Sequence, residues 1–209
     1  MGSNIEKRDE AALRTTGSAE TATDTITFIQ LSPEHFEGVI ELGNSVHGDN
    51  YLTPELLANY YNRSLHNNIN ASWIALQNNT VVGFRLTFAH TQWTQDKWCS
   101  PHLWNVDKEK VCYFKCNTVS PLKQALGIGS ALLAKSIESA KAQGAVAGLA
   151  HIWLASPGNS AFKYFSKNGG VLVRKHANKW QHASIHEGYD CPVCSGYCEC
   201  EGAEMLLSF

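Results

Sequence analysis

The chain has 209 residues, of which 44% are hydrophobic and 17% are charged, and its formal net charge at pH 7 is -2. This length and balance predict one globular domain, and the near-neutral charge gives no basic patch for a nucleic acid or an anionic membrane. No apolar stretch approaches the ~20 residues of a membrane span, and the residues after Met1 lack the apolar core of a signal peptide. We therefore expect a cytoplasmic protein, monomeric or homodimeric, with no nucleic-acid or membrane partner.

The N-terminal segment differs in composition from the rest of the chain. Residues 1–24 are rich in Thr, Ala, Ser, Glu and Asp and contain few large apolar groups. Such a segment buries too little apolar surface to offset the entropy lost on ordering. The sequence therefore predicts a flexible tail over 1–24, followed by a single domain over 25–209.

The domain is predicted to begin with a strand and two helices. Residues 26–31 alternate in hydropathy as a strand does, and Ser32-Pro33 then gives a capping residue followed by proline at the first helical position. A helix should run from there to about Val46. Thr53-Pro54 repeats the same start signal, which predicts a second helix.

The middle of the chain combines a regular and an irregular segment. Residues 72–90 predict a β-hairpin, because two apolar runs flank the polar stretch over 77–80. Residues 91–110 show no helical or strand period, although they contain three tryptophans. An excursion folded over a ligand site and a surface loop pinned by buried indoles explain this pattern equally well.

The second half of the chain predicts a βαβ unit. Its parts are a strand over 111–119, an amphipathic helix over 127–143 and a strand over 149–155. This order normally places the two strands parallel in one sheet. A short helix over 159–167 and strands over 171–173 and 204–209 are predicted to complete the domain.

Two glycines mark the turn between the strand and the helix of this unit. Gly127 and Gly129 would let the backbone pass close to a phosphate, whose charge the N-terminal end of the helix favours. A pair of glycines by itself indicates a helix cap equally well. A P-loop is excluded because Ser130 stands where lysine is required, and a dinucleotide-binding turn is excluded because Leu132 replaces the third glycine.

The surrounding residues identify a family. The stretch from Val119 to Gly129, Val-Ser-Pro-Leu-Lys-Gln-Ala-Leu-Gly-Ile-Gly, resembles the V-x-P-x-x-[RQ]-x-x-G-x-G segment of the GNAT superfamily of N-acetyltransferases. The order of predicted elements from Ile26 to Phe209 is also similar to that of the family. The resemblance implies a three-layer mixed α/β fold, with a mostly antiparallel mixed sheet of about seven strands flanked by about four helices.

The resemblance also implies an activity and a set of site residues. The activity is transfer of an acetyl group from acetyl-CoA to a primary amine of a small molecule or a protein. The backbone N–H of Val119 would stabilise the oxyanion, and Tyr164 would protonate the leaving thiolate, unless the helix presents Phe165 instead. The residues expected to contact the coenzyme are Asn117, Thr118, Val119, Gln124, Leu126, Gly127, Ile128, Gly129, Ser130, Asn159 and Phe162.

The general base is not indicated by the sequence. An ammonium group of pKa about 10.4 must lose a proton before it attacks a thioester. The strand over 111–119 has no carboxylate, although many relatives have one there. The candidates are His151, Asp96, His90 and Glu109, together with a route through water or no dedicated base. A catalytically silent acyl-CoA-binding sensor or interaction module is the alternative function, in which this chemistry has been lost.

Four of the seven cysteines lie close together near the C-terminus. Cys191, Cys194, Cys198 and Cys200 fall within a predicted loop over 186–201. Four thiolates would suit tetrahedral zinc, although zinc sites more often separate their cysteine pairs by a longer loop. Free thiols explain the spacing as well, whereas a reducing cytosol disfavours disulfides. We therefore assign no metal ligand from the sequence, and we treat zinc as a possible cofactor that the spacing does not favour.

Overall fold

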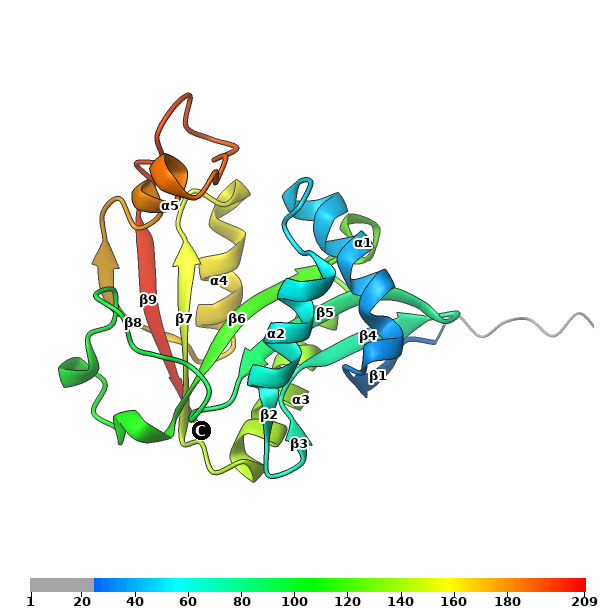
Figure 1. The fold of residues 1–209 in the computed structure, drawn as a ribbon. Coiled ribbons are helices and arrows are strands. Elements are labelled where there is room, and N and C mark those ends of the chain that lie inside the picture. Colours follow the sequence, from blue (N-terminus) through cyan, green and yellow to red (C-terminus); the bar gives the residue numbers. More distant parts are fainter. Residues whose placement is uncertain (1–24) are drawn as a thin grey trace, which may run out of the picture.

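The computed structural model describes residues 25–209, and the flexible tail predicted for residues 1–24 lies outside them. Among the described residues, no helix is both long and apolar enough to cross a lipid bilayer. Helices and connecting loops surround one large sheet (Figure 1).

The large sheet has seven strands. From one edge to the other it contains β1 (Thr27–Gln30), β4 (Trp73–Gln77), β5 (Thr80–Phe88), β6 (Val111–Val119), β7 (Ala147–Trp153), β9 (Gly202–Ser208) and β8 (Val171–His176). β6 and β7 are parallel, and every other neighbouring pair is antiparallel. The predictions of a βαβ unit and of a mixed, mostly antiparallel sheet are therefore confirmed.

Two main helices cover each face of the sheet. α1 (Phe36–His47) and α2 (Pro54–Ser64) lie on one face, and α3 (Ile128–Ala142) and α4 (Ser160–Lys167) lie on the other (Figure 1). The predicted start of α2 is confirmed in detail, because the Thr53 hydroxyl accepts a hydrogen bond from the Leu56 N–H and Pro54 follows it. The three layers are those that the family resemblance implies.

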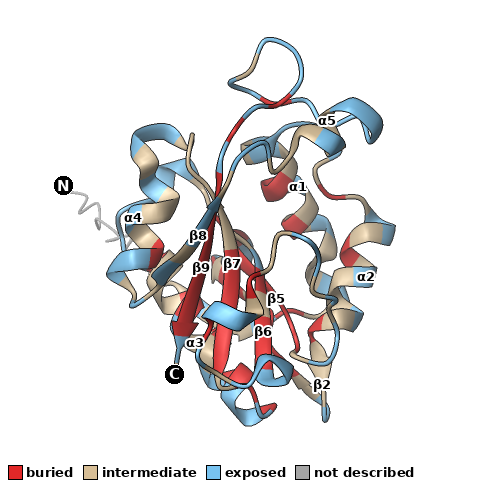
Figure 2. Ribbon diagram, turned by 90° about the vertical axis from the view of Figure 1, so that its left-hand side faces the viewer, coloured by how far each residue is buried: buried red, intermediate tan, exposed pale blue. Residues whose placement is uncertain are grey.

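The alternation of side chains along the strands separates two hydrophobic cores. Ile74 and Phe84 are fully buried beneath α1 and α2, whereas the adjacent Ala75 and Gly83 face α3. Strands β7 and β9 are buried over most of their length, in contrast to the exposed loop beyond α5 (Gln181–His186) (Figure 2). The sheet is therefore covered on both faces.

The hairpin predicted over 72–90 is formed by β4 and β5. Asn78 and Asn79 join the strands with φ angles of 50° and 62°. A two-residue hairpin turn requires this left-handed backbone, which asparagine adopts more readily than most residues. The polar stretch over 77–80 therefore predicted the position of the turn correctly.

The sequence did not predict three features of the fold. These are α5, the two-stranded hairpin of β2 (Leu65–His66) and β3 (Ile69–Asn70), and the full length of β8. β8 is an edge strand whose residues are mostly exposed, so it lacks the apolar alternation that signals a strand. β9 begins two residues before the predicted range, at Gly202.

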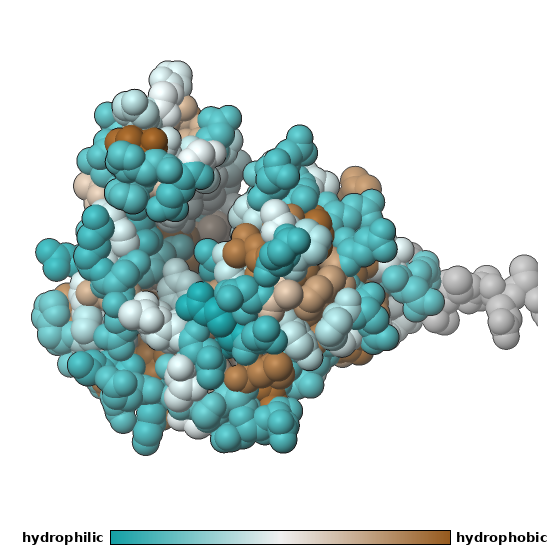
Figure 3. Space-filling view, viewed as in Figure 1, coloured by the Kyte–Doolittle hydropathy of each residue, from teal (hydrophilic) through white to brown (hydrophobic). Residues whose placement is uncertain are grey.

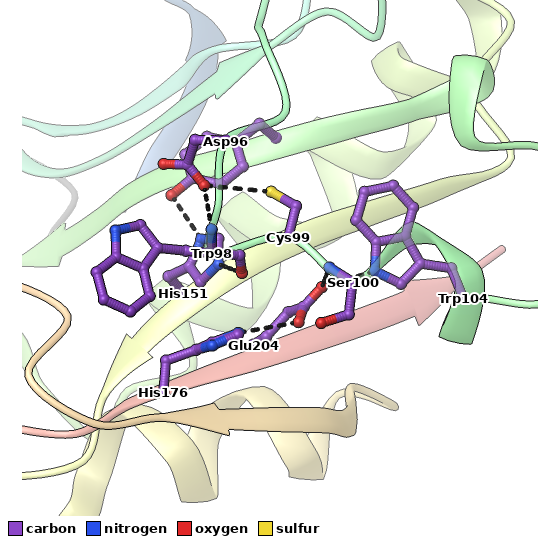
Figure 4. Close-up of polar contacts among 9 residues, drawn as sticks. Asp96, Trp98, Cys99, Ser100, Trp104, His151, His176 and Glu204 are labelled. Atoms are coloured by element: carbon purple, nitrogen blue, oxygen red, sulfur yellow. Dashed lines mark hydrogen bonds and ion pairs between the residues drawn. The ribbon is translucent and has the colours of Figure 1, made fainter.

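The irregular segment over 91–110 is pinned to the sheet by a buried carboxylate. Glu204 of β9 accepts hydrogen bonds from the Ser100 N–H and the Trp104 indole, both at 2.7 Å, and pairs with His176 at 3.1 Å (Figure 4). Burial alone would raise the pKa of Glu204, but these hydrogen bonds outweigh it and hold the pKa below its usual value. The segment is thus a loop pinned by a buried indole, as one of the two sequence-based interpretations expected.

Candidate active site

Strands β6 and β7 separate shortly after they begin. Their parallel pairing covers only Val111–Tyr113 against Ala147–Leu149. Beyond these residues the two strands diverge and are no longer paired (Figure 1), and we call the separation between their backbones the gap. β7 stays paired with β9 as far as Trp153, so the gap lies wholly on its β6 side.

The register of β6 determines which backbone groups face this gap. The Ser120 N–H donates to the Val82 oxygen at 2.9 Å, and Thr118 is paired with Phe84 in the same ladder. Because successive N–H groups of a strand point to opposite edges, those of Asn117 and Val119 point away from β5 and into the gap. The Val119 N–H, which is expected to serve as the oxyanion donor, therefore points into the gap.

The turn after β6 leads directly into α3. Gly127 has a φ of 80° and is followed by Ile128 as the first helical residue. The Ala131 N–H is bonded to the Gly127 oxygen, so the N–H groups of residues 128–130 precede the intrahelical ladder. N–H groups at the start of a helix have no partner within the helix, and together with the positive end of the helix dipole they suit a phosphate group.

Gly129 lies where α3 approaches both β6 and α4. A Cβ atom at this position would lie 3.1 Å from the Asn117 amide nitrogen and 3.4 Å from the Tyr164 ring. The Tyr164 hydroxyl donates a hydrogen bond to the Gly129 carbonyl at 2.8 Å. Phe165 instead packs inward against Phe114, with ring centroids 5.9 Å apart. It is therefore Tyr164 that the helix directs to the turn.

Arg85 is a polar residue of this region that the sequence analysis missed. It is 2% exposed in the middle of β5, donates to the Tyr164 hydroxyl at 3.3 Å and lies 4.5 Å from the Phe114 ring centroid. Burial lowers the pKa of its guanidinium, although interactions with Tyr164 oppose that shift. In the described part of the chain no carboxylate pairs with it. The sequence signal that could have identified Arg85 is that it is a single charged residue within the apolar run of β5.

Two asparagines expected to contact the coenzyme carry unsatisfied polar atoms. The side-chain oxygens of Asn117 and Asn159 are buried and have no hydrogen-bond partner in the described structure. Asn159 precedes α4 with a left-handed φ of 54°. Buried acceptors without partners are uncommon in native proteins, and a ligand that donates hydrogen bonds would satisfy them.

Of the remaining residues expected to contact the coenzyme, Gln124 and Leu126 belong to the turn and Phe162 belongs to α4. The Gln124 side chain reaches back to the Val119 oxygen at 3.5 Å, and Leu126 is 65% exposed. Phe162 packs against the core beneath α4. The residues that the fold brings together at the turn are therefore Asn117, Gly129 and Tyr164.

A family model described as the acetyltransferase (GNAT) family matches residues 36–169, well over half of the chain. The chain belongs to the GNAT family of acetyltransferases. A search of curated proteins gave no match.

Solved acetyltransferase structures share this fold. A GNAT-family acetyltransferase from Streptococcus pneumoniae superposes with a TM-score of 0.64 and 15% identity, covering 88% of this chain and 100% of that one. The structure of yncA from Salmonella typhimurium, a putative acetyltransferase with its cofactor acetyl-CoA, gives a TM-score of 0.61 and 17% identity, and covers 88% of this chain and 93% of that one. Ard1 from Thermoplasma volcanium gives a TM-score of 0.62 and 15% identity, and covers 88% of this chain and 97% of that one. At such identities the likeness establishes the fold alone.

On the α1 side of the gap, the acetyltransferase has a polar cluster. His47, at the end of α1, is 2.9 Å from the Thr118 hydroxyl, and Tyr51 donates to the Cys116 sulfur at 3.0 Å. Thr118 directly precedes Val119, so the cluster lies beside the gap. Burial lowers the pKa of His47 below its usual 6.5, which leaves the imidazole neutral at pH 7. His47 could not be selected from the sequence, because the contact joins residues 71 positions apart.

The acetyltransferase also has a cavity of about 180 Å³ on this face. It lies between α2, the irregular segment over 91–110, and strands β6 and β7. The irregular segment therefore borders a cavity in addition to being pinned to the sheet by Glu204. Its lining combines aromatic rings with one carboxylate and two cations. The lining residues are Tyr60, Arg63, Phe88, Trp93, Thr94, Asp96, Cys99, Tyr113, Lys115 and His151.

The base candidates from the sequence are distributed unevenly. Asp96 and His151 line the cavity, whereas His90 and Glu109 are not among its lining residues. Both His151 ring nitrogens are engaged, one 3.2 Å from the Tyr113 hydroxyl and the other 2.7 Å from the Trp98 oxygen. Burial is the main cause that lowers the pKa of His151 to about 4. A neutral, doubly hydrogen-bonded histidine of this kind has its lone pair occupied, which suits a structural role better than proton transfer.

Proposed function

We propose that this protein is an acetyl-CoA-dependent N-acetyltransferase that transfers an acetyl group to a primary amine. The observation that carries the proposal is the gap between β6 and β7, with the Val119 N–H directed into it and the N–H groups of residues 128–130 beside it. We retain as predictions that the enzyme is cytoplasmic and that residues 25–209 form a single domain.

The donor would be held by backbone more than by side chains. Residues 128–130 offer three N–H groups and the helix dipole to the pyrophosphate. The pantetheine arm carries amide N–H groups, and the unpaired acceptors of Asn117 and Asn159 suit them. The thioester would then lie in the gap, with its carbonyl oxygen toward the Val119 N–H.

The reaction would form an N–C bond and break a C–S bond. The neutral amine attacks the thioester carbon, and the Val119 N–H stabilises the negative charge that develops on oxygen. Tyr164 then gives its proton to the departing thiolate, after its hydrogen bond to the Gly129 carbonyl is released. Burial raises the pKa of Tyr164, and the adjacent Arg85 opposes that shift without reversing it, so the phenol keeps its proton until the thiolate departs.

We assign the role of general base to His47. Its ring contacts Thr118, next to the proposed oxyanion donor, from the face opposite to the coenzyme turn. Because its pKa lies below 6.5, it is in the form that accepts a proton at pH 7. It would take the proton that the amine loses during attack.

The cavity supports a small acceptor. A volume of about 180 Å³ lies below the usual range for drug-sized ligands and suits a small amine or a single residue of a larger one. Asp96 and the aromatic rings favour an ammonium group, whereas Arg63 and Lys115 favour an anion. We therefore propose an acceptor that carries both a primary amine and an anionic group.

The test is acetyl transfer across a panel of paired amines. Each amino acid would be compared with its own amide, which keeps the amine and removes the negative charge. Released CoA and acetylated product would be measured by mass spectrometry, so that the protein's own thiols do not interfere. The proposal predicts amine-dependent CoA release that is faster with the free acid of each pair.

Two outcomes would change the assignment. Coenzyme binding without CoA release from any amine would favour the silent sensor or interaction module. Release that is equal for acids and amides would leave the acetyltransferase in place but contradict the proposed acceptor class.

A further inference from the structure

The connection between β8 and β9 contains a group of four cysteines. We call residues 187–201, which follow α5, the cysteine loop. Its four sulfur atoms all lie within 4.8 Å of one another. Cys191 and Cys200 are 3.8 Å apart, and Cys194 and Cys200 are 3.6 Å apart. Cys191, Cys198 and Cys200 are buried, at 4%, 0% and 8% exposure.

We propose that these four cysteines bind one zinc ion as thiolates. In a tetrahedral site with Zn–S bonds of about 2.3 Å, the sulfur atoms are about 3.8 Å apart, close to the 3.8 Å and 3.6 Å that separate Cys200 from Cys191 and Cys194. A disulfide would need about 2.05 Å. An iron–sulfur cluster distributes its thiolates over several irons, so four sulfurs this close together suit a single ion better.

The surroundings of the four sulfurs also resemble a metal site. The four cysteines form one mostly buried cluster beside Trp153 and Trp180, which shields the sulfur atoms from solvent as the apolar surroundings of a metal site do. The Cys198 N–H donates to the Ser184 hydroxyl at 2.8 Å, which ties the loop to α5. A shielded group of sulfurs in a loop anchored to a helix suits a structural metal ion.

The loop has little else to hold it in one conformation. Val193 and Tyr197 are exposed, at 59% and 64%, so the cysteines and the flanking Trp153 and Trp180 make up most of its buried apolar cluster. A segment with so small a core commonly depends on a metal or a disulfide for its structure.

The short spacing between the cysteine pairs does not prevent tetrahedral binding. Only three residues separate Cys194 from Cys198, and Gly196 among them has a φ of 137°. This conformation lets the chain reverse, so that the second pair folds back onto the first. The sequence argument against zinc was that zinc sites more often separate their cysteine pairs by a longer loop, and this reversal removes the need for one.

The zinc would hold one side of a hollow on the molecular surface. Figure 3 shows this hollow between the cysteine-loop lobe and the end of α1. Loss of the metal would therefore release the wall of this hollow that faces the end of α1, where His47 lies.

The first test is the metal content of the full-length protein purified without chelator. Elemental analysis by mass spectrometry should give one zinc per chain and no stoichiometric iron or copper. A mercurial thiol reagent should release that zinc into a chromogenic chelator. Cobalt exchanged into the protein should give the strong visible bands of tetrahedral cobalt bound to four thiolates.

Variants then assign the ligands. C194S and C200S should each lose most of the zinc, whereas C99S, a change at a cysteine outside the loop, should keep one zinc per chain. If the loop variants do not fold, the zinc content and the cobalt spectrum of the unmodified protein still decide the question. Zinc well below one per chain, with all seven thiols reactive or with disulfides in the loop, would overturn the proposal.

Discussion

The turn before α3 can be tested by replacing Gly127 with glutamate. A Cβ atom at this position would meet no atom within 4 Å, so the side chain fits without a clash. The φ of 80° costs a residue other than glycine about 1–2 kcal/mol, which lowers the melting temperature by about 2–8 °C in a domain of this size. The protein should therefore still fold.

The effect on coenzyme binding should be much larger than the effect on stability. A carboxylate about 4 Å from a phosphate charge costs about 1 kcal/mol in bulk water and about 4 kcal/mol at a partly buried site. With about 1.4 kcal/mol for each factor of ten, we expect acetyl-CoA to bind about 5- to 700-fold more weakly. Isothermal titration calorimetry measures this change directly.

Gly169 provides a matched control for this experiment. It follows the C-terminal end of α4 and has a φ of 97°, and a Cβ atom there would also meet no atom within 4 Å. Gly169→Glu should lose similar stability but keep its affinity for acetyl-CoA. An unchanged affinity in Gly127→Glu, or equal losses in both variants, would refute the placement of the pyrophosphate.

Three further predictions concern individual side chains. Tyr164→Phe should lower kcat about 100-fold with little change in the KM for acetyl-CoA, as steady-state kinetics will measure, because the proton donor is lost while the turn is kept. His47→Gln should remove the acid limb of the pH profile of kcat/KM; in the parent enzyme, activity should fall as the pH drops through the lowered pKa of His47, below 6.5. Glu204→Gln should cost about 1.5–3 kcal/mol in urea unfolding at pH 7, because charged hydrogen bonds to Ser100, Trp104 and His176 are weakened.

Each of these predictions has a distinct contradictory result. A Tyr164→Phe enzyme that is less stable but fully active would make the phenol a packing group. If the acid limb persists in His47→Gln, another residue must be the general base. For Glu204, the depressed pKa means that its stabilising effect is complete above 4.5 and is lost as the pH falls through the folded value; equal stability of the parent and Glu204→Gln at pH 7 would refute this.

Local signals made the turn between β6 and α3 predictable from the sequence. Gly127 and Gly129, the preceding strand and the amphipathic helix all lie within one short stretch of chain, so their relation in space follows from their order. The layers of the fold followed for the same reason, because each main helix and strand carries its own period or cap. The full length of edge strand β8 was not predicted, because most of its residues are exposed and therefore lack the alternation of a half-buried strand.

The rest of the site depends on contacts between distant parts of the chain. His47 reaches Thr118 across 71 positions, and Arg85 reaches Tyr164 across 79. Neither residue stands in a motif, and each becomes informative only when the sheet brings its partner close. The four cysteines are an intermediate case, since their proximity in sequence was evident but the reversal at Gly196 was not.

A crystal structure with acetyl-CoA tests the central claim most directly. We predict the pyrophosphate on the N–H groups of residues 128–130, the pantetheine in the gap between β6 and β7, and the thioester oxygen within hydrogen-bond distance of the Val119 N–H. A coenzyme bound elsewhere, with the gap left empty, would contradict the account.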